Sequence, residues 1–290
     1  MAENILQTLI DNAIENTIVK LTSDIVVAES TIVTKNITID LNGYTIKNTE
    51  DIWNEDAKSW SLISVRNGGI LTLLDSSEAG TGTLCAKEND CFAVDVRNGG
   101  MLIIESGNYI GNISSVYVHS GTAYINGGYY KVQQISGANG YGETINCYDT
   151  NFKNGTAKVI ISGGSFYNFD PTDAAEPADC NQSYLSKNTK MAYDEETKSY
   201  VATKREFKIV ATTSDRVEAL GVKDGQLIFV QDEGKIAFDF NGARVFYDNG
   251  GELDDIYSKI TVLEEEKVDA TTVQTMIEKY SESAMTIVEF

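Results

Sequence analysis

The strongest constraint on the fold of this chain is an internal repeat built around sharp corners. Residues 65–73 (Val-Arg-Asn-Gly-Gly-Ile-Leu-Thr-Leu) recur 31 positions later as residues 96–104 (Val-Arg-Asn-Gly-Gly-Met-Leu-Ile-Ile), and a looser copy begins 22 positions further on at Val118. A second pattern begins at Ile104, Ile125 and Ile161, with spacings of 21 and 36 residues. A spacing in the low twenties fits one solenoid turn with three short strands, and the longer spacings indicate the same coil carrying a loop insertion.

The residue types within the repeat support a solenoid. Asn-Gly and Gly-Gly pairs supply the positive φ that a sharp corner needs, and we expect Asn42, Asn67 and Asn98 at such corners, where asparagines can form hydrogen-bonded ladders. The chain has only two prolines in 290 residues, as expected if every coil donates hydrogen bonds to its neighbours. A hairpin meander is the rival interpretation, but the recurring unit spans several strands and corners.

The opening of the chain carries a family resemblance. Residues 21–27 (Leu-Thr-Ser-Asp-Ile-Val-Val) and 36–46 (Asn-Ile-Thr-Ile-Asp-Leu-Asn-Gly-Tyr-Thr-Ile) resemble the first coils of the pectate-lyase-like right-handed parallel β-helix superfamily. Residues 1–17, with apolar positions at helical spacing from Ile5 to Ile14, resemble the helix that caps such solenoids. The resemblance implies a mainly β fold with a parallel β-helix over residues 18–170. It implies no particular activity, because this fold carries many functions.

The repeat stops after Phe169, and the remaining chain divides into three segments. Residues 171–205 contain both prolines and are expected to form a closing loop and a hairpin, with the hairpin over 190–203. Residues 206–250 are expected to form a small antiparallel β module with hairpin turns at 232–234 and 241–242. Within it, residues 224–230 (Asp-Gly-Gln-Leu-Ile-Phe-Val) and 234–245 are similar to a short module of structural proteins of tailed bacteriophages, especially gut phages.

Residues 251–290 are expected to form a C-terminal α-helical segment that associates as a coiled coil. Apolar residues recur there at alternating spacings of three and four, which is the pattern of a coiled-coil seam. The predicted oligomerisation residues are Leu253, Ile256, Ile260, Leu263, Ala270, Val273, Ile277 and Tyr280. An amphipathic helix folded back on its own domain is the alternative. The phage resemblance implies a homotrimer, and the sequence leaves trimer or dimer open.

Charge and composition restrict the partners. The 43 acidic and 23 basic residues give a formal net charge of −20, which disfavours binding to nucleic acid and to anionic membrane surfaces. The four cysteines lack paired spacing and the one histidine, His119, has no ligand near it in sequence, so no metal or cofactor is expected. No signal peptide is evident after Met1. We therefore expect a chain made in a reducing bacterial cytoplasm.

The sequence contains no catalytic motif, although a β-helix could carry a polysaccharide lyase or glycosidase. Candidate carboxylates are Asp90, Asp95 and Asp149, with Lys131 or Arg97 as the base. However, Arg97 and Arg66 occupy equivalent repeat positions, where a ladder of solvated side chains is the ordinary interpretation. His119 is expected to be an ordinary, partly buried side chain. We expect a protein that is not an enzyme.

The fifteen tyrosines suggest a binding role instead. Solvent-facing aromatic rings on a rigid sheet can stack on sugars, although strand alternation places about half of them in the core. The candidate glycan-stacking residues are Tyr109, Tyr129, Tyr130 and Tyr141.

These observations and resemblances favour a structural virion protein of a tailed bacteriophage. The expected form is a homotrimeric fibre, a head fibre in preference to a tail fibre, that contacts capsid or tail proteins and host surface glycans. A tail-associated polysaccharide depolymerase and a bacterial surface adhesin are the alternatives.

Overall fold

The computed structural model divides the chain into two compact units, Met1–Thr203 and Lys204–Phe290. It describes residues 4–52, 60–87, 91–134, 143–172, 183–186, 189–204, 208–223, 226–230, 232–233, 235–240 and 242–247. The predicted C-terminal seam and the candidates Asp90 and Tyr141 lie outside these residues.

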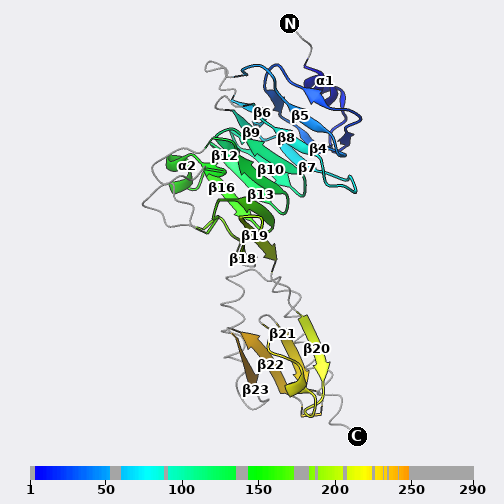
Figure 1. The fold of residues 1–290 in the computed structure, drawn as a ribbon, viewed down its shortest axis with the longest axis vertical. Coiled ribbons are helices and arrows are strands. Elements are labelled where there is room, and N and C mark those ends of the chain that lie inside the picture. The colour runs from blue at the N-terminus through cyan, green and yellow to red at the C-terminus, as the bar shows by residue number, and fades with distance from the viewer. Residues whose placement is uncertain are drawn as a thin grey trace. The chain divides into compact units, whose positions relative to one another are not determined.

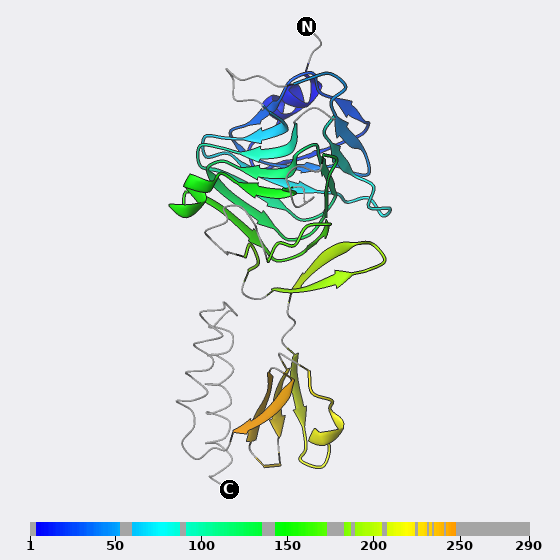
Figure 2. The ribbon, with the colours of Figure 1, turned by 60° about the vertical axis from the view of Figure 1, so that its left-hand side comes forward.

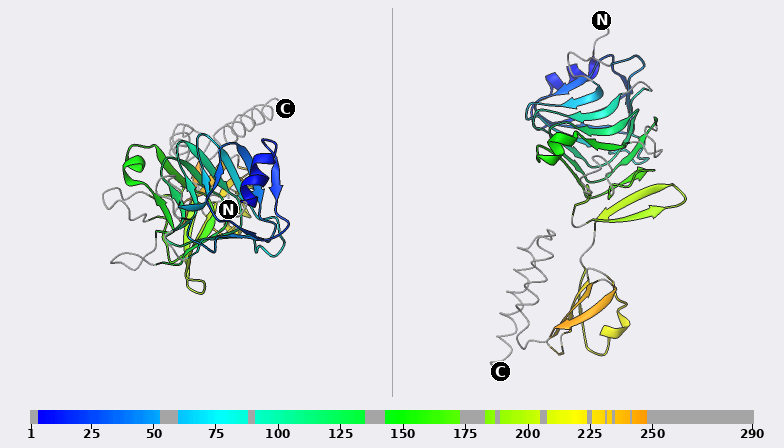
Figure 3. Two further views of the ribbon diagram at one scale, coloured as in Figure 1. Left: turned by 90° about the horizontal axis from the view of Figure 1, so that it is seen from above. Right: turned by 90° about the vertical axis from the view of Figure 1, so that its left-hand side faces the viewer.

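The first unit is mainly β, with three parallel sheets that we name A, B and C (Figure 1). Sheet A has the strand order β1-β4-β7-β10-β13-β16, and sheet C has the order β15-β12-β9-β6-β3. In sheet B, the strands β17-β14-β11-β8-β5-β2 follow the pair β18-β19. Successive strands along the chain thus visit A, B and C in turn, and each sheet receives every third strand. This is the arrangement of a β-helix-like solenoid, and Figure 3 shows the strands stacked one above another.

The strands are short, as the frequent Thr, Ser, Asp and Asn breaks predict. Sheet A contains β1 (Ile18–Lys20), β4 (Asn36–Asp40), β7 (Ile70–Leu74), β10 (Gly100–Ile104), β13 (Gly121–Ile125) and β16 (Ala157–Ile161). Sheet B contains β2 (Ile25–Val26), β5 (Thr45–Lys47), β8 (Thr83–Cys85), β11 (Asn108–Gly111), β14 (Tyr129–Val132) and β17 (Gly164–Tyr167). Sheet C contains β3 (Thr31–Val33), β6 (Ser61–Val65), β9 (Phe92–Val96), β12 (Ser114–Val118) and β15 (Ile145–Cys147).

The register confirms the repeat seen in the sequence. Val65 pairs with Val96 and Val96 with Val118 in sheet C, while Ile104 pairs with Ile125 and Ile125 with Ile161 in sheet A. The 31- and 36-residue spacings contain insertions between strands. One of these holds the short helix α2 (Asp149–Lys153), which lies on the outside of the coils (Figures 1 and 3).

The asparagine corners form in part as expected. Asn42, Asn67 and Asn98 all have positive φ. Asn98 donates its side-chain amide to Asn67 Oδ1 at 3.4 Å, which makes one rung of a ladder between sheets C and A. Asn42 lies at a different corner, between sheets A and B, and donates to the carbonyl of Leu21 instead. At the same C–A corners the coils approach so closely that a Cβ at Gly100 would clash with the backbone oxygen of Val65.

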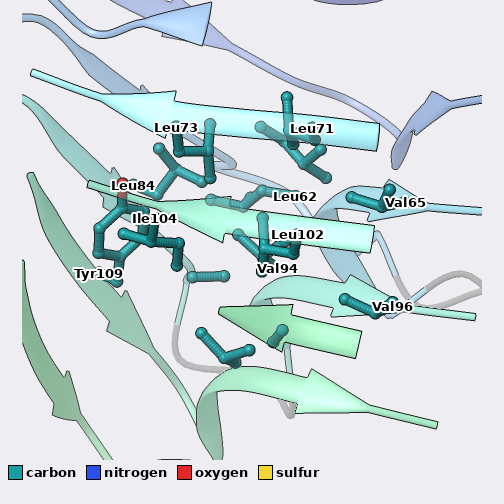
Figure 4. Packing of buried hydrophobic residues seen from close by; sticks show 14 of the residues in the cluster. Leu62, Val65, Leu71, Leu73, Leu84, Val94, Val96, Leu102, Ile104 and Tyr109 are labelled. Atoms are coloured by element: carbon teal, nitrogen blue, oxygen red, sulfur yellow. The ribbon is translucent and has the colours of Figure 1, made fainter. Parts of the chain in front are cut away.

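Aliphatic side chains fill the interior of the solenoid in layers that follow the register. In Figure 4, Leu71 and Leu73 on β7 lie beside Leu102 and Ile104 on β10, and all four are fully buried. Burial of such side chains contributes about 1.5–3 kcal/mol each to folding. This continuous core explains the alternation of Val, Ile and Leu in the sequence.

A stack of aromatic rings also lies inside the core, under sheet B. Tyr109, Tyr130 and Phe166 occupy equivalent positions in successive coils, with ring centroids 5.3 and 5.0 Å apart. The Tyr130 hydroxyl donates to Gly127 O and the Tyr109 hydroxyl to Ser106 O, so both buried polar ends have partners. Since Tyr109 and Tyr130 are 0% exposed, the prediction that they stack on glycans is wrong. The alternation of side chains along β11 and β14 directs both rings into the core.

The N-terminal helix α1 (Ile5–Asn12) caps the first coil, as expected (Figure 2). The helix buries Leu6 and Ile10. Ile5 and Leu9 of the helix are exposed, as is Ile14 after its end, so the buried stripe is narrower than the sequence pattern suggests. The side-chain amide of Gln7 hydrogen-bonds both the N–H and the C=O of Ile32 in the edge strand β3. Gln7 therefore occupies the place that a further strand would take and blunts an otherwise open edge.

The last coil ends in the predicted hairpin, formed by β18 (Thr189–Asp194) and β19 (Ser199–Lys204) (Figure 2). β19 pairs antiparallel with β17, so the parallel order of sheet B reverses here.

The second unit contains a four-stranded sheet in the order β20 (Lys208–Thr212), β21 (Gln226–Val230), β22 (Lys235–Phe240) and β23 (Ala243–Tyr247). The pairs β21–β22 and β22–β23 are antiparallel hairpins, as predicted. The expectation of a wholly antiparallel module is wrong, because β20 pairs with β21 in parallel. The crossover between them includes the 3-10 helix η1 (Val217–Ala219), which sequence periodicity did not reveal.

A buried ion pair holds this crossover. Asp239 and Arg244 face each other across the β22–β23 hairpin, and Nε and Nη2 of Arg244 donate to the two carboxylate oxygens of Asp239 at 2.7 and 2.8 Å. Arg244 also donates to the carbonyls of Val217 and Leu220, while Asp239 accepts from the backbone N–H of Lys223. The hydrogen bonds from Arg244 hold the pKa of Asp239 below its usual value. This polar pair thus fixes the crossover together with Val217, which is buried against Ile228, Val230 and Ala237.

Substitutions at Tyr130 test the aromatic stack. Tyr130→Phe removes one hydrogen bond and keeps the ring, as Phe166 does in the next coil, so we expect a loss of about 0.5–1.5 kcal/mol in unfolding free energy. Tyr130→Ala leaves a cavity and should cost about 3–5 kcal/mol. Urea unfolding of the first unit measures both, with Tyr193→Ala on the exposed face of β18 as the control. A Tyr130→Ala effect no larger than the control would contradict the burial of this ring.

The Asp239–Arg244 pair predicts acid sensitivity of the second unit. Because the folded-state pKa of Asp239 is lowered, the stability it contributes is present above the unfolded-state pKa of about 3.9 and is lost as pH falls through the lower folded-state value. Thermal unfolding between pH 7 and pH 2.5 should show a decline below about pH 4. In Asp239→Asn the unit should be less stable at pH 7, and this part of the decline should disappear. An unchanged pH profile in that variant would argue against the assignment.

Candidate functional site: an arginine and aromatic surface on sheet C

Sheet C brings charged and aromatic side chains into two adjacent outward rows. The first row contains Ser64, Asp95, Tyr117 and Asn146, which are paired in register. The second row follows two residues later in each coil and contains Arg66, Arg97, His119 and Tyr148. The backbone N–H groups of Arg97, His119 and Tyr148 each donate to the valine carbonyl of the preceding coil, which fixes this second row. We name the two rows, with Trp60 and Phe92, the sheet C surface.

Asp95 and Arg97 form a buried ion pair on this surface. Arg97 Nε donates to Asp95 Oδ2, and the side chains are 7% and 0% exposed. Ser61 donates its hydroxyl to the other carboxylate oxygen of Asp95 at 3.0 Å. The expectation that Arg97 is a solvated ladder residue is therefore wrong, since the strand places it against Asp95 two residues earlier. Arg66 is partly exposed and donates its Nε to Ser64 Oγ at 2.6 Å.

Aromatic rings extend from this pair along the coils. The guanidinium carbon of Arg97 lies 4.4 Å from the ring centroid of Trp60 and 5.7 Å from that of Tyr117. Tyr117 stacks on Phe92 at 4.8 Å, and His119 stacks on Tyr148 at 4.9 Å with an angle of 12° between the rings. Phe92 is buried, Tyr117 and His119 are partly exposed, and Tyr148 is 43% exposed. The second row thus extends from the buried guanidinium of Arg97 to the exposed ring of Tyr148.

The electrostatics of the sheet C surface follow from burial and from the arginines. Loss of solvent lowers the pKa of Arg66, and the nearby Arg97 lowers it further, while Asp95 opposes the shift. Burial also lowers the pKa of His119, with Arg97 as a second cause, so the imidazole is neutral at pH 7. Burial raises the pKa of Tyr117 to about 12. At neutral pH, the charged groups in the two rows are therefore two guanidinium groups and one carboxylate.

A smaller aromatic cluster lies on the outer face of sheet B. Tyr129 and Lys131 alternate with the buried Tyr130 on β14. Nζ of Lys131 lies 4.8 Å from the centroid of the Tyr167 ring on the neighbouring strand β17, which is a cation–π contact. Burial, with a smaller contribution from Tyr167, raises the pKa of Tyr129. Tyr129 is the one predicted glycan-stacking residue that the structure describes outside the core.

The predicted catalytic candidates are not brought together as a set. Asp95 and Arg97 meet, but as a structural ion pair, while Lys131 lies on sheet B and Asp149 begins α2 after sheet C. His119 is partly buried, as expected. Cys85, Cys91 and Cys147 do not form disulfides. Among the residues that the structure describes, no group of three or more His, Cys, Asp or Glu is placed to hold a metal ion, and no helix has the length and apolar character needed to cross a membrane.

Sequence reasoning missed Trp60, Tyr117 and Tyr148 as members of one surface. A signal was present in the repeat, because the residues that directly follow β6, β9, β12 and β15 are Arg66, Arg97, His119 and Tyr148. Aligning the coils would have placed these four side chains in one row. Trp60 precedes the repeated segment, so only the fold shows that it contacts Arg97.

A double-mutant cycle tests the Asp95–Arg97 pair. Asp95→Asn leaves a buried guanidinium without its counter-charge, so we expect a loss of about 3–5 kcal/mol in unfolding free energy. Replacing Arg97 as well, in Asp95→Asn/Arg97→Gln, should recover part of that loss, since the unpaired charge is removed. Chemical denaturation of the two single variants and the double variant measures the coupling. Strictly additive effects would show that the two side chains do not interact.

Three comparisons place the chain against known proteins. No family model matches it, no curated protein matches it, and no solved structure matches it. The interpretation of the fold and of the sheet C surface therefore rests on the residues of this chain.

Proposed function

We propose that this chain is a structural virion protein of a tailed bacteriophage, in which a right-handed parallel β-helix is displayed on the particle as part of a homotrimeric fibre. A head fibre is favoured over a tail fibre, and the partners are capsid or tail proteins and host surface glycans. The observation that carries the proposal is the uninterrupted hydrogen-bonded stack of coils, closed by α1 at one end and by the β18–β19 hairpin at the other. Such a stack provides stiffness and resists unfolding from its edges.

The carboxylates of the solenoid support a structural role. Burial opposes ionisation of Asp75, yet hydrogen bonds from Gly82, Ser77 and Gly43 outweigh it and lower the pKa of this carboxyl. Asp40 is held in the same way by Ser76 and Asn42. Asp95 is held by Arg97 and Ser61. All three carboxylates make contacts that fix corners and strands. The lowered pKa values of Asp40 and Asp75 do not suit a general acid, which needs a raised pKa.

The sequence supplies the remaining support. The second unit contains the segment that is similar to modules of phage fibre, baseplate and head-decoration proteins, and the spacing of apolar residues in 251–290 predicts a seam that joins chains. With a net charge of −20 on each chain, neighbouring fibres would repel one another and remain dispersed.

Light scattering tests the assembly. A homotrimer of the 31.7 kDa chain should have a mass of about 95 kDa, three times the chain mass. Removal of residues 251–290 should yield monomers, because the seam is lost. A full-length chain that stays monomeric at micromolar concentration would contradict the trimer.

Mass spectrometry and electron microscopy of purified phage particles test the location. We expect peptides of this chain in the particle and labelling at the head surface. Absence of the chain from purified particles would overturn the proposed function.

A further inference from the structure

Two neighbouring coils turn their C–A corners with the same pair of residues, an asparagine followed by a glycine. In the first of them, Asn67 and Gly68 have φ of 54° and 77°, and the N–H of Gly69 donates to the carbonyl of Arg66 at 2.9 Å. This is a type I′ turn, which needs positive φ at both central residues. Asn67 and Gly68 are exposed, and a Cβ at Gly68 would meet no neighbouring atom. The pair therefore has open space around it.

An asparagine followed by a glycine is the pair in which a backbone nitrogen attacks a side-chain amide most easily. Glycine has no Cβ to hinder the approach, and it allows the backbone rotation that brings its nitrogen to the amide carbon Cγ. The nitrogen bonds to Cγ and gives its proton to solvent, while the side-chain nitrogen takes up a proton and leaves as ammonia. Water then opens the resulting cyclic succinimide at either carbonyl, which gives aspartate or isoaspartate. Water is the only co-reactant, and nothing is oxidised or reduced.

The reacting groups of the Asn67–Gly68 pair are not held in place. Among the residues that the structure describes, neither the N–H of Gly68 nor Nδ2 of Asn67 has a hydrogen-bond acceptor. The side chain is contacted through Oδ1, which accepts the 3.4 Å hydrogen bond from Asn98. That bond withdraws electron density from Cγ and leaves the carbon accessible to attack.

The next coil protects the equivalent pair in part. The N–H of Gly99 donates to the carbonyl of Ser120 at 3.2 Å, and Asn98 donates its side-chain amide to the asparagine of the coil before. The length of the corners explains the first bond. Residues 97–99 form this corner and residues 119–120 form the next one, between strands that stay in register. Because the later corner is one residue shorter, its carbonyl reaches the N–H of Gly99.

The pair at the corner between sheets A and B is held at both reacting groups. Asn42 donates its side-chain amide to the carbonyl of Leu21 at 3.0 Å, and the N–H of Gly43 donates to Asp75 Oδ1 at 2.8 Å. The corner is also enclosed, since a Cβ at Gly43 would lie against the side chain of Ser77. Attack at Asn42 therefore requires both hydrogen bonds to break first.

Two further described pairs have bound side-chain amides. Asn126 donates to Glu105 and accepts from Ser162, so both ends of its amide are held. Asn154 accepts from the backbone N–H and the hydroxyl of Thr156. The remaining asparagines followed by glycine lie outside the described residues: Asn139, Asn241 and Asn249.

We propose that Asn67 is a site of spontaneous deamidation in the folded chain, and that the other four described pairs are protected by their hydrogen bonds. The reaction adds a negative charge to the corner. Its isoaspartate product also inserts a further carbon atom into the backbone of a tight turn, next to the rung that Asn98 makes. The inference is independent of the virion role, because it depends on the corners of the solenoid alone.

Peptide mapping by mass spectrometry tests the proposal site by site, after incubation of the full chain at mildly alkaline pH. Asn67 should deamidate at least about tenfold faster than Asn42, because two hydrogen bonds hold the reacting groups of Asn42. Asn98 should react at an intermediate rate. In guanidinium chloride, where the chain is unfolded, the rates at Asn67 and Asn42 should agree within about threefold, since the fold no longer distinguishes the two pairs.

Hydroxylamine provides a second readout, because it cleaves the chain at a succinimide. It should cut the incubated protein between residues 67 and 68. Asn67→Gly keeps the positive φ of the turn and should abolish this cut, whereas the matched variant Asn98→Gly should retain it. Circular dichroism shows whether each variant is folded.

Three results would overturn the proposal. The first is deamidation of Asn42 in the folded chain as fast as that of Asn67. The second is an unmodified Asn67 under conditions in which the unfolded chain deamidates. The third is a difference between the two sites that persists unchanged in guanidinium chloride, since the ordering would then come from local sequence and not from the corners.

Discussion

The hydrogen bonds between successive coils are the interaction on which the rest of the first unit depends. Every strand of sheets A, B and C pairs with its equivalents one coil before and after, apart from those at the ends. This pairing fixes the register, and the register in turn aligns every side chain with its counterpart in the next coil. Core layers, the aromatic stack of Tyr109, Tyr130 and Phe166, and the rows of the sheet C surface are all consequences of that alignment. A loop insertion changes the path between strands but leaves this alignment intact.

Polar residues take part in the same periodic order. Asn126 donates its side-chain amide to Glu105 Oε1, and Ser162 donates its hydroxyl to Asn126 Oδ1, so one corner carries a hydrogen-bonded row across three coils. At the same A–B corner one coil earlier, Asp75 accepts backbone N–H groups from Gly43 and Gly82, which lie in the A–B connections of two successive coils. Such contacts replace the hydrogen bonds that tight corners cannot make among themselves. In this unit, the acidic residues that lie near the backbone contribute to structure as well as to charge.

Much of the solenoid could be predicted from the sequence, because residues that are equivalent in the repeat are the residues that pair between successive coils. Val65, Val96 and Val118 were aligned by their neighbours alone, and the structure pairs them. The direction of individual side chains was harder to predict. Tyr109 and Tyr130 are inward, since a shift of one residue within a strand exchanges the two faces. Arg97 faces outward and is nevertheless buried, because it pairs with Asp95 and lies against the ring of Trp60. The contact of Trp60 with Arg97 and the parallel pair β20–β21 depend on loops, whose path no local pattern encodes.

The closure of both ends has a consequence for the size of the solenoid. A stack of coils has no intrinsic length, because each new coil presents the same edge to the next. Here the side chain of Gln7 covers the edge of sheet C at β3, and a reversal of strand direction, from β17 to β19, covers the edge of sheet B at the other end. The sequence thereby fixes the number of coils, and the length of the solenoid does not change with concentration or partner.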